Sequence, residues 1–176
     1  MLKQTLHPSR TTWHITFGTY GTRLHGGDLP TVERNANLPG QPFLTMDHHR
    51  KEWIQGSMRD QPIRLTDEQR VFIEETLPRI CEPGHWTYRI GAAPPPPDNT
   101  HVHLLCDADP SIHGKQIRQW LKRWLTEAMN HRWKRSSRTP WWAEAGSTKP
   151  VKNDQYLNHA FEYIRRQRTI PFIECG

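Results

Sequence analysis

The sequence predicts an α+β domain whose sheet is mainly antiparallel. Segments of strand composition occur at 13–20, 86–90 and 101–106, and helical patterns occur at about 66–81, 115–128 and 153–170. Their order is strand, helix, strand, strand, helix, helix, which lacks the strict alternation of strand and helix that is typical of a parallel sheet. The length of 176 residues predicts that 1–176 form one domain.

The predicted strands are rich in β-branched and aromatic residues, as in Trp13-His-Ile-Thr-Phe17. Four prolines at 94–97 separate the second strand from the third, because proline donates no hydrogen bond to a sheet. Residues 21–62 are dense in Gly, Pro, Asn, Asp and His, which predicts a long loop-rich excursion with a short helix near 47–58. Short additional strands are expected near Ile63 and Val151.

Capping residues and apolar periodicity predict three helices. Thr66 and Gln69 have the spacing of a capping box, so a helix is expected from there to about Cys81. The final helix is expected to begin at Asn153 or Asp154 and to stop before the proline at 171. The middle helix has the clearest apolar stripe, formed by Ile117, Trp120, Leu121, Trp124, Leu125 and Ala128.

The charge balance favours a polyanionic partner. Lys and Arg number 24 against 18 Asp and Glu, a net charge of +6, which points to nucleic acid before a membrane surface. No stretch approaches the ~18 consecutive apolar residues that a membrane helix needs, and the N-terminal residues have no secretory-signal pattern. The 3 cysteines are far apart and form no Cys-x-x-Cys pair, which argues against a disulfide scaffold and for the cytoplasm.

The middle helix is the predicted nucleic-acid-binding surface. Glu127 is the only acidic residue among its many basic ones, whereas an ordinary solvated face mixes both signs. Trp141 and Trp142, which follow it, are candidates for stacking on unpaired bases or for filling the core. The residues expected to contact DNA phosphates are Lys115, Arg118, Lys122, Arg123, Arg132, Lys134 and Arg135.

His101 and His103 form a candidate metal-binding pair. Side chains two apart in a strand share a face, so the two imidazoles are expected to project together, with Val102 and Leu104 pointing the other way. Taken alone, the same pattern also fits two half-exposed histidines on a strand.

Tyr163 and Gln167 extend this candidate site on the final helix. They are separated by one helical turn and lie on the flank of the predicted buried stripe, so both are able to face the two histidines. Two imidazoles and an amide oxygen suit a divalent cation, and the Tyr163 hydroxyl is then a candidate nucleophile. Otherwise Tyr163 is a residue at the rim of the core. Tyr156 is the rival nucleophile, but its partner one turn later is Ala160, which cannot bind a metal.

Two motifs together carry a family resemblance. Pro97-Asp-Asn-Thr-His-Val-His-Leu-Leu105, followed by Ala160-Phe-Glu-Tyr-Ile-Arg-Arg-Gln167, resembles the HUH single-tyrosine transposases, especially the REP-associated tyrosine transposases. The resemblance extends over roughly residues 11–170 and includes the segment Trp142-Ala-Glu-Ala-Gly-Ser-Thr-Lys149.

This resemblance implies a ferredoxin-like core and action on single-stranded DNA near imperfect hairpins. It implies that His101, His103 and Gln167 hold Mg²⁺ or Mn²⁺. It further implies that Tyr163 attacks a DNA phosphate, leaving a 5′-phosphotyrosine link and a free 3′-hydroxyl. Family members act as monomers or homodimers, and they need no ATP because the phosphotyrosine conserves the bond energy.

Two other functions compete with this strand-transfer enzyme. The first is a domesticated DNA-hairpin-binding protein that has lost turnover, although the complete set of candidate residues argues against that loss. The second is an unrelated metal hydrolase in which the two histidines act without a tyrosine. Such an enzyme would normally add a third histidine or a carboxylate at helical spacing, and no such companion is present in the sequence.

Overall fold

A computed structural model describes residues 3–22, 52–53, 56, 58, 60–134 and 139–172. The excursion predicted at 21–62, with its short helix near 47–58, falls largely outside the described residues. In order, the elements are β1 (Thr11–Gly18), α2 (Asp67–Cys81), β2 (Thr87–Ala92), β3 (His101–Ala108), α3 (Gly114–Arg132), β4 (Ser147–Pro150) and α4 (Asp154–Arg166).

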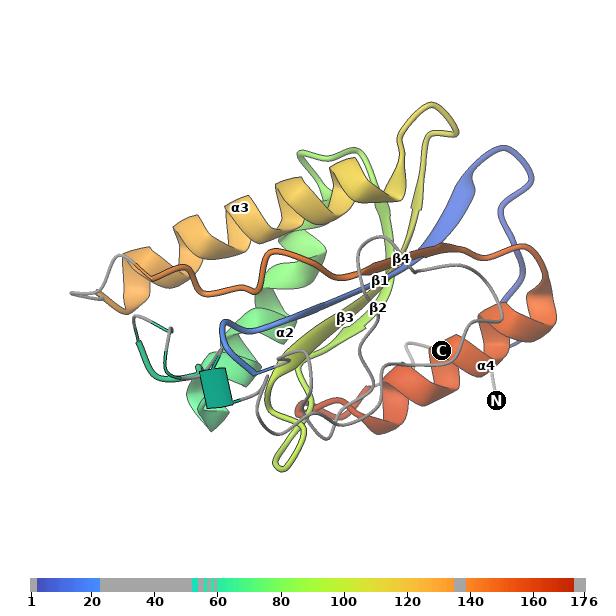
Figure 1. Ribbon diagram of the computed structural model, residues 1–176. Helices are drawn as coiled ribbons and strands as arrows, with labels where there is room; N and C mark the ends of the chain where they lie inside the picture. Colours follow the sequence, from blue (N-terminus) through green and yellow to red (C-terminus); the bar gives the residue numbers. More distant parts are fainter. Residues whose placement is uncertain are drawn as a thin grey trace.

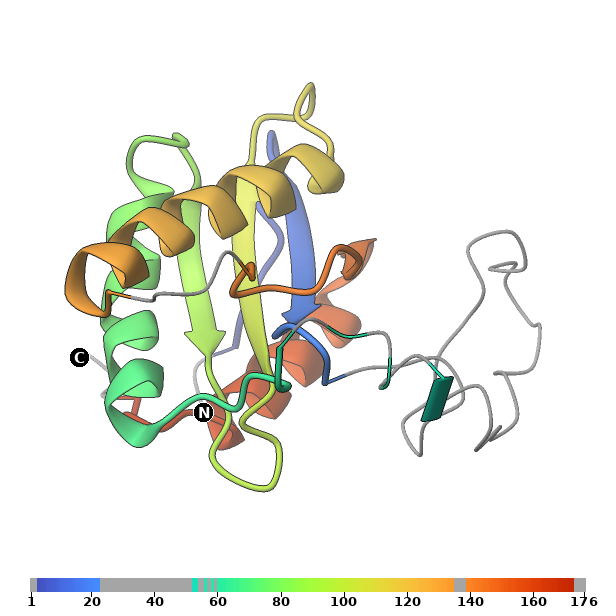
Figure 2. The same ribbon diagram turned by 60° about the vertical axis from the view of Figure 1, so that its left-hand side comes forward.

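The four strands form one antiparallel sheet in the order β2-β3-β1-β4. The succession from β1 to β4 has the β-α-β-β-α-β connectivity of the ferredoxin-like fold. Helices α2 and α3 lie on one side of the sheet, and α4 lies on the other (Figures 1 and 2). The predicted α+β class with a mainly antiparallel sheet is therefore confirmed.

Local sequence signals account for the ends of the helices. The hydroxyl of Thr66 accepts a hydrogen bond from the Gln69 backbone N–H at 3.3 Å, and the side-chain oxygen of Gln69 accepts one from the Thr66 backbone N–H at 3.0 Å. Asn153 rather than Asp154 caps α4, because its Oδ1 accepts from the backbone N–H of Tyr156 at 2.8 Å. The expected helix ends thus follow from capping chemistry.

The strands differ in part from the expectation. β3 runs two residues further than predicted, to Ala108, and all of its residues are buried because both faces of the strand are covered. β4 ends at Pro150, just before Val151. Ile63 lies outside the named strands, although its N–H donates to the carbonyl of Tyr20 at 2.9 Å.

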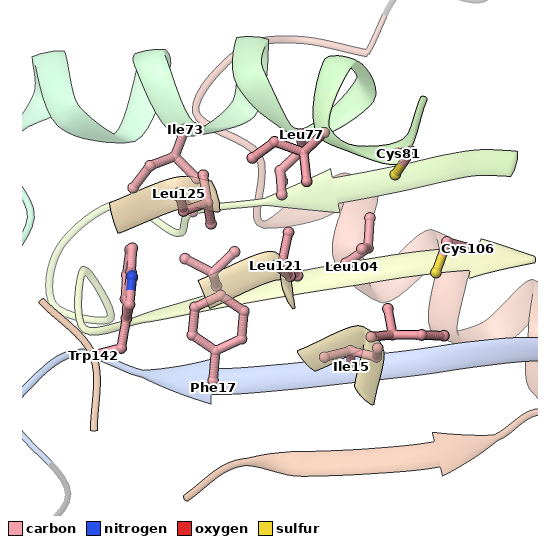
Figure 3. Packing of buried hydrophobic residues seen from close by; sticks show 14 of the residues in the cluster. Ile15, Phe17, Ile73, Leu77, Cys81, Leu104, Cys106, Leu121, Leu125 and Trp142 are labelled. Atoms are coloured by element: carbon pink, nitrogen blue, oxygen red, sulfur yellow. The ribbon is translucent and has the colours of Figure 1, made fainter. Parts of the chain in front are cut away.

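The main core lies between the sheet and the α2–α3 pair (Figure 3). Trp141 and Trp142 belong to it, with only 4% and 5% of their surface exposed. Their indole N–H groups donate to Asn130 at 2.8 Å and to Thr126 at 3.1 Å. Of the two interpretations of these tryptophans, base stacking is wrong and core filling is correct, because buried rings present no face to a base.

A second, smaller core lies between the sheet and α4. Leu157, Ala160, Phe161 and Ile164 form the buried stripe of α4, as the sequence predicted, and they pack against Ile90, Ala92 and Leu105. No helix in the described part of the chain is both long enough and apolar enough to cross a membrane.

Candidate functional site

The candidate site lies on the α4 side of the sheet, where β3 presents His101 and His103. Leu105 on the same strand packs into the α4 core, whereas Val102 and Leu104 pack into the α2–α3 core. The two imidazole rings are in contact, with centroids 4.6 Å apart and planes at 90°. Each residue is only 5% exposed, so the alternative of two half-exposed histidines is wrong.

A hydroxyl on the neighbouring strand orients His103. Thr16 on β1 is paired with His103 across the sheet, and its Oγ1 lies 2.9 Å from His103 Nδ1. A metal ligand of this kind usually has its second ring nitrogen engaged by such a partner, which holds the ring in position. The contact with Thr16 therefore suits His103 to bind a cation through Nε2.

Tyr163 lies directly against this histidine pair. Its ring meets the His103 ring edge-on, with centroids 5.5 Å apart and an interplanar angle of 83°. The side chain is 48% exposed, so one end of the ring is packed while the other faces solvent. The expected approach of Tyr163 to the histidine pair is thus present at His103, and nearly half of the tyrosine remains exposed.

Gln167 ends the helix one turn after Tyr163, as the C-cap residue of α4. Its Oε1 is buried and accepts no hydrogen bond from any described residue. An acceptor left unsatisfied in this way costs about 1–3 kcal/mol, so a cation at this position would stabilise it. Within the described residues, no group of three or more His, Cys, Asp and Glu side chains is close enough to hold a metal ion. The candidate metal ligands are therefore His101, His103 and the side-chain oxygen of Gln167 together, because the two histidines alone are too few.

His14 on β1 is a site residue that sequence reasoning missed. Its ring centroid lies 5.7 Å from that of His103, and its Nδ1 lies 3.2 Å from the hydroxyl of Tyr156. Burial lowers the pKa of His14 to about 4, and the nearby charge of Lys149 acts in the same direction. His14 is therefore a neutral imidazole at pH 7. The alternation of side chains along β1 could have shown that His14 and Thr16 share one face. Only the pairing of β1 with β3 shows that this is the face that carries His103.

Tyr156, the rival nucleophile, is also part of this cluster. Its hydroxyl is engaged by His14, and burial raises the pKa of its phenol. A phenol with a raised pKa is less readily ionised. The two tyrosines also differ in position, since Tyr156 meets His14 whereas Tyr163 meets His103.

A buried carboxylate anchors the chain that follows Gln167. Glu74 on α2 accepts hydrogen bonds from the backbone N–H groups of Thr169 at 2.8 Å, Ile170 at 2.9 Å and Ala93 at 3.0 Å. Its side chain also forms an ion pair with Arg168 at 3.6 Å and is 0% exposed. Glu74 thereby ties the end of α4 to α2 and to the chain just after β2. Nothing in the local sequence indicated this contact.

Five of the seven basic residues expected to bind DNA lie on α3, on the opposite side of the sheet from α4: Lys115, Arg118, Lys122, Arg123 and Arg132. Lys122 donates to three backbone carbonyls, of Ala143 at 2.7 Å and of Glu144 and Ala145 at 2.9 Å. Arg118 donates to the carbonyl of Gly146. These two side chains hold the segment between α3 and β4.

The other basic residues expected to bind DNA differ in their surroundings. Arg123 pairs with Glu127 at 3.1 Å, and Arg132 pairs with Glu68 at 2.8 Å. Lys115 and Lys134 are exposed, and Arg135 lies outside the described residues.

Comparisons with known proteins give little further information. No protein-family model matches the chain, and no curated protein matches it. Among solved structures, the chain is similar to a protein from Deinococcus radiodurans R1 that is described as a "putative transposase". The sequence identity is 14% over 96% of this chain and 98% of the other, with a TM-score of 0.39. At this level of similarity, the neighbour's activity is not transferred to this chain.

Proposed function

We propose that this protein is a metal-dependent, transposase-like enzyme that nicks single-stranded DNA and transfers the strand through a 5′-phosphotyrosine intermediate. The observation that carries the proposal is the contact between the rings of Tyr163 and His103, which brings a half-exposed phenol onto a buried histidine pair. The motif resemblance to HUH single-tyrosine transposases supports the same chemistry. Its DNA substrates carry hairpins near the cleavage site.

The chain's own residues have distinct roles in this reaction. The Tyr163 oxygen attacks a phosphorus of the strand, the bond from phosphorus to the 3′-oxygen breaks, and the phosphate remains on Tyr163. The proton lost by the tyrosine is balanced by the proton gained by the departing 3′-oxygen. His101, His103 and Gln167 would hold Mg²⁺ or Mn²⁺, which when bound stabilises negative charge on the phosphate. Because the step only exchanges one phosphate ester for another, a 3′-hydroxyl reverses it without ATP.

A covalent-trapping assay tests this function. The protein is mixed with labelled single-stranded DNA taken from the flanks of its own gene, and Mn²⁺ is added. We expect a protein–DNA adduct that survives denaturant and that does not form when a chelator is present. Tight hairpin binding without any adduct would instead identify the non-catalytic hairpin-binding protein.

We expect His101→Ala to weaken Mn²⁺ binding by at least about tenfold, because it removes one imidazole ligand from the set. Isothermal titration calorimetry with Mn²⁺ measures the affinity without DNA. The exposed His131 on α3 offers a matched control, since His131→Ala removes an imidazole far from the site. Equal Mn²⁺ affinities for His101→Ala and the parent protein would contradict the proposed ligand set.

A further inference from the structure

Helix α4 covers only half of the sheet face that carries the site. Its main contacts are with β2 and β3, where residues such as Ile90, Ala92 and Leu105 are buried beneath it. On the other half, His14 of β1 lies against Tyr156 of α4, whereas Ser147 and Lys149 on β4 are exposed. The site therefore has a closed side toward β2 and an open side toward β4.

The strand register determines which side chains line this open half. His14 is paired with Lys149, and Thr16 is paired with Ser147. Directly paired residues in an antiparallel sheet project from the same face. Because His14 contacts Tyr156 of α4, this face is the one that carries the site. Lys149 therefore projects beside His14, and its charge is close enough to lower the pKa of His14.

Lys149 is available to a ligand. Its side chain is exposed and forms no ion pair with any described residue. The basic residues of α3 are placed differently, because α3 and the helix that carries Tyr163, α4, lie on opposite sides of the sheet (Figure 2). In addition, two of them, Arg118 and Lys122, already donate to backbone carbonyls.

A DNA strand with one phosphate at Tyr163 must continue past the site over some part of the protein. On the β2 side α4 blocks its course, whereas on the β4 side Ser147 and Lys149 are exposed. From β3 to β4 the strand would cross two inter-strand spacings, roughly 10 Å in total. Directly across from His103 this path reaches Ser147, and Lys149 lies two residues further along β4. The ammonium of Lys149 is complementary in charge to a phosphate.

We propose that Lys149 binds a backbone phosphate of the single-stranded DNA substrate next to the phosphate that Tyr163 attacks. The substrate path then runs from Tyr163 toward the exposed β4 edge of the sheet, and the basic residues of α3 lie outside it. This inference rests on the proposed function for its choice of ligand. The contact is electrostatic and independent of base identity, so it positions the strand without reading its sequence.

Salt-dependent binding of a labelled oligo(dT) strand tests the contact without metal and without cleavage. The parent protein carries Tyr163→Phe, so no covalent chemistry contributes. We expect Lys149→Ala to lower the affinity roughly three- to tenfold and to reduce the slope of log K against log salt by about 0.7, the value for one single-strand phosphate contact. Lys149→Arg, which keeps the charge, should retain most of the affinity and most of the salt slope of the parent.

Arg79→Ala provides the control, because Arg79 is an exposed basic residue of α2, on the opposite side of the sheet, and is not among the residues expected to contact DNA. We expect it to bind like the parent. An unchanged slope for Lys149→Ala, an equal loss for Arg79→Ala, or no binding of oligo(dT) by the parent would overturn the proposal. These results are separable from the proposed function, since an adduct on Tyr163 in the trapping assay stands or falls without reference to Lys149.

Discussion

Replacing Tyr163 with phenylalanine is expected to abolish the covalent protein–DNA adduct while hairpin binding stays within about twofold of the parent. The ring that packs edge-on against His103 is retained, so the site keeps its shape, but the only atom removed is the proposed nucleophile. Loss of a nucleophile typically lowers the rate by at least about 10³-fold. Quantified adduct on a denaturing gel, together with an equilibrium binding curve, measures the two effects separately.

Tyr156→Phe is the matched control for this experiment. It also removes one phenolic hydroxyl from α4, and Tyr156 is exposed to a comparable degree, 37% against 48% for Tyr163. We expect it to form adduct, because its hydroxyl contacts His14 and the pKa of its phenol is raised by burial. If Tyr156→Phe lost the adduct and Tyr163→Phe kept it, the nucleophile would be Tyr156.

Glu74→Ala is expected to lower the free energy of unfolding by about 3–5 kcal/mol, the usual cost of removing one partner of a buried charged pair. The substitution leaves Arg168 without its buried carboxylate and deprives three backbone N–H groups of their acceptor. Glu74→Gln keeps one acceptor oxygen, so its loss should be smaller. Urea denaturation followed by circular dichroism measures both variants.

The adjacent Glu75 provides the control, because it is an exposed carboxylate on the same helix turn. Glu75→Ala should change the unfolding free energy by no more than about 0.5 kcal/mol. A loss below about 1 kcal/mol for Glu74→Ala would show that the carboxylate does not anchor the segment after α4.

Features that depend on near neighbours in the chain could be predicted from the sequence. The capping box at Thr66, the cap at Asn153 and the buried stripe of α4 are confirmed because each arises from residues within a few positions of one another. Strand alternation likewise placed His101 and His103 on one face. The approach of Tyr163 to that face was an expectation from the same local periodicities, and the structure contains it. The metal and the phosphotyrosine chemistry remain predictions.

Only the tertiary structure decided which distant residues meet. His14 and Lys149 join the site through the pairing of β1 with β3 and β4, and a register shifted by one residue would turn both away from it. Glu74 reaches the end of α4 across about 95 positions of chain. The placement of α3 and α4 on opposite sides of the sheet separates the basic helix from Tyr163. The sequence by itself determined the elements and their local faces, since short-range hydrogen bonds and periodicity control these. Long-range pairing and burial determined the composition of the site, because they depend on the packing of the whole chain.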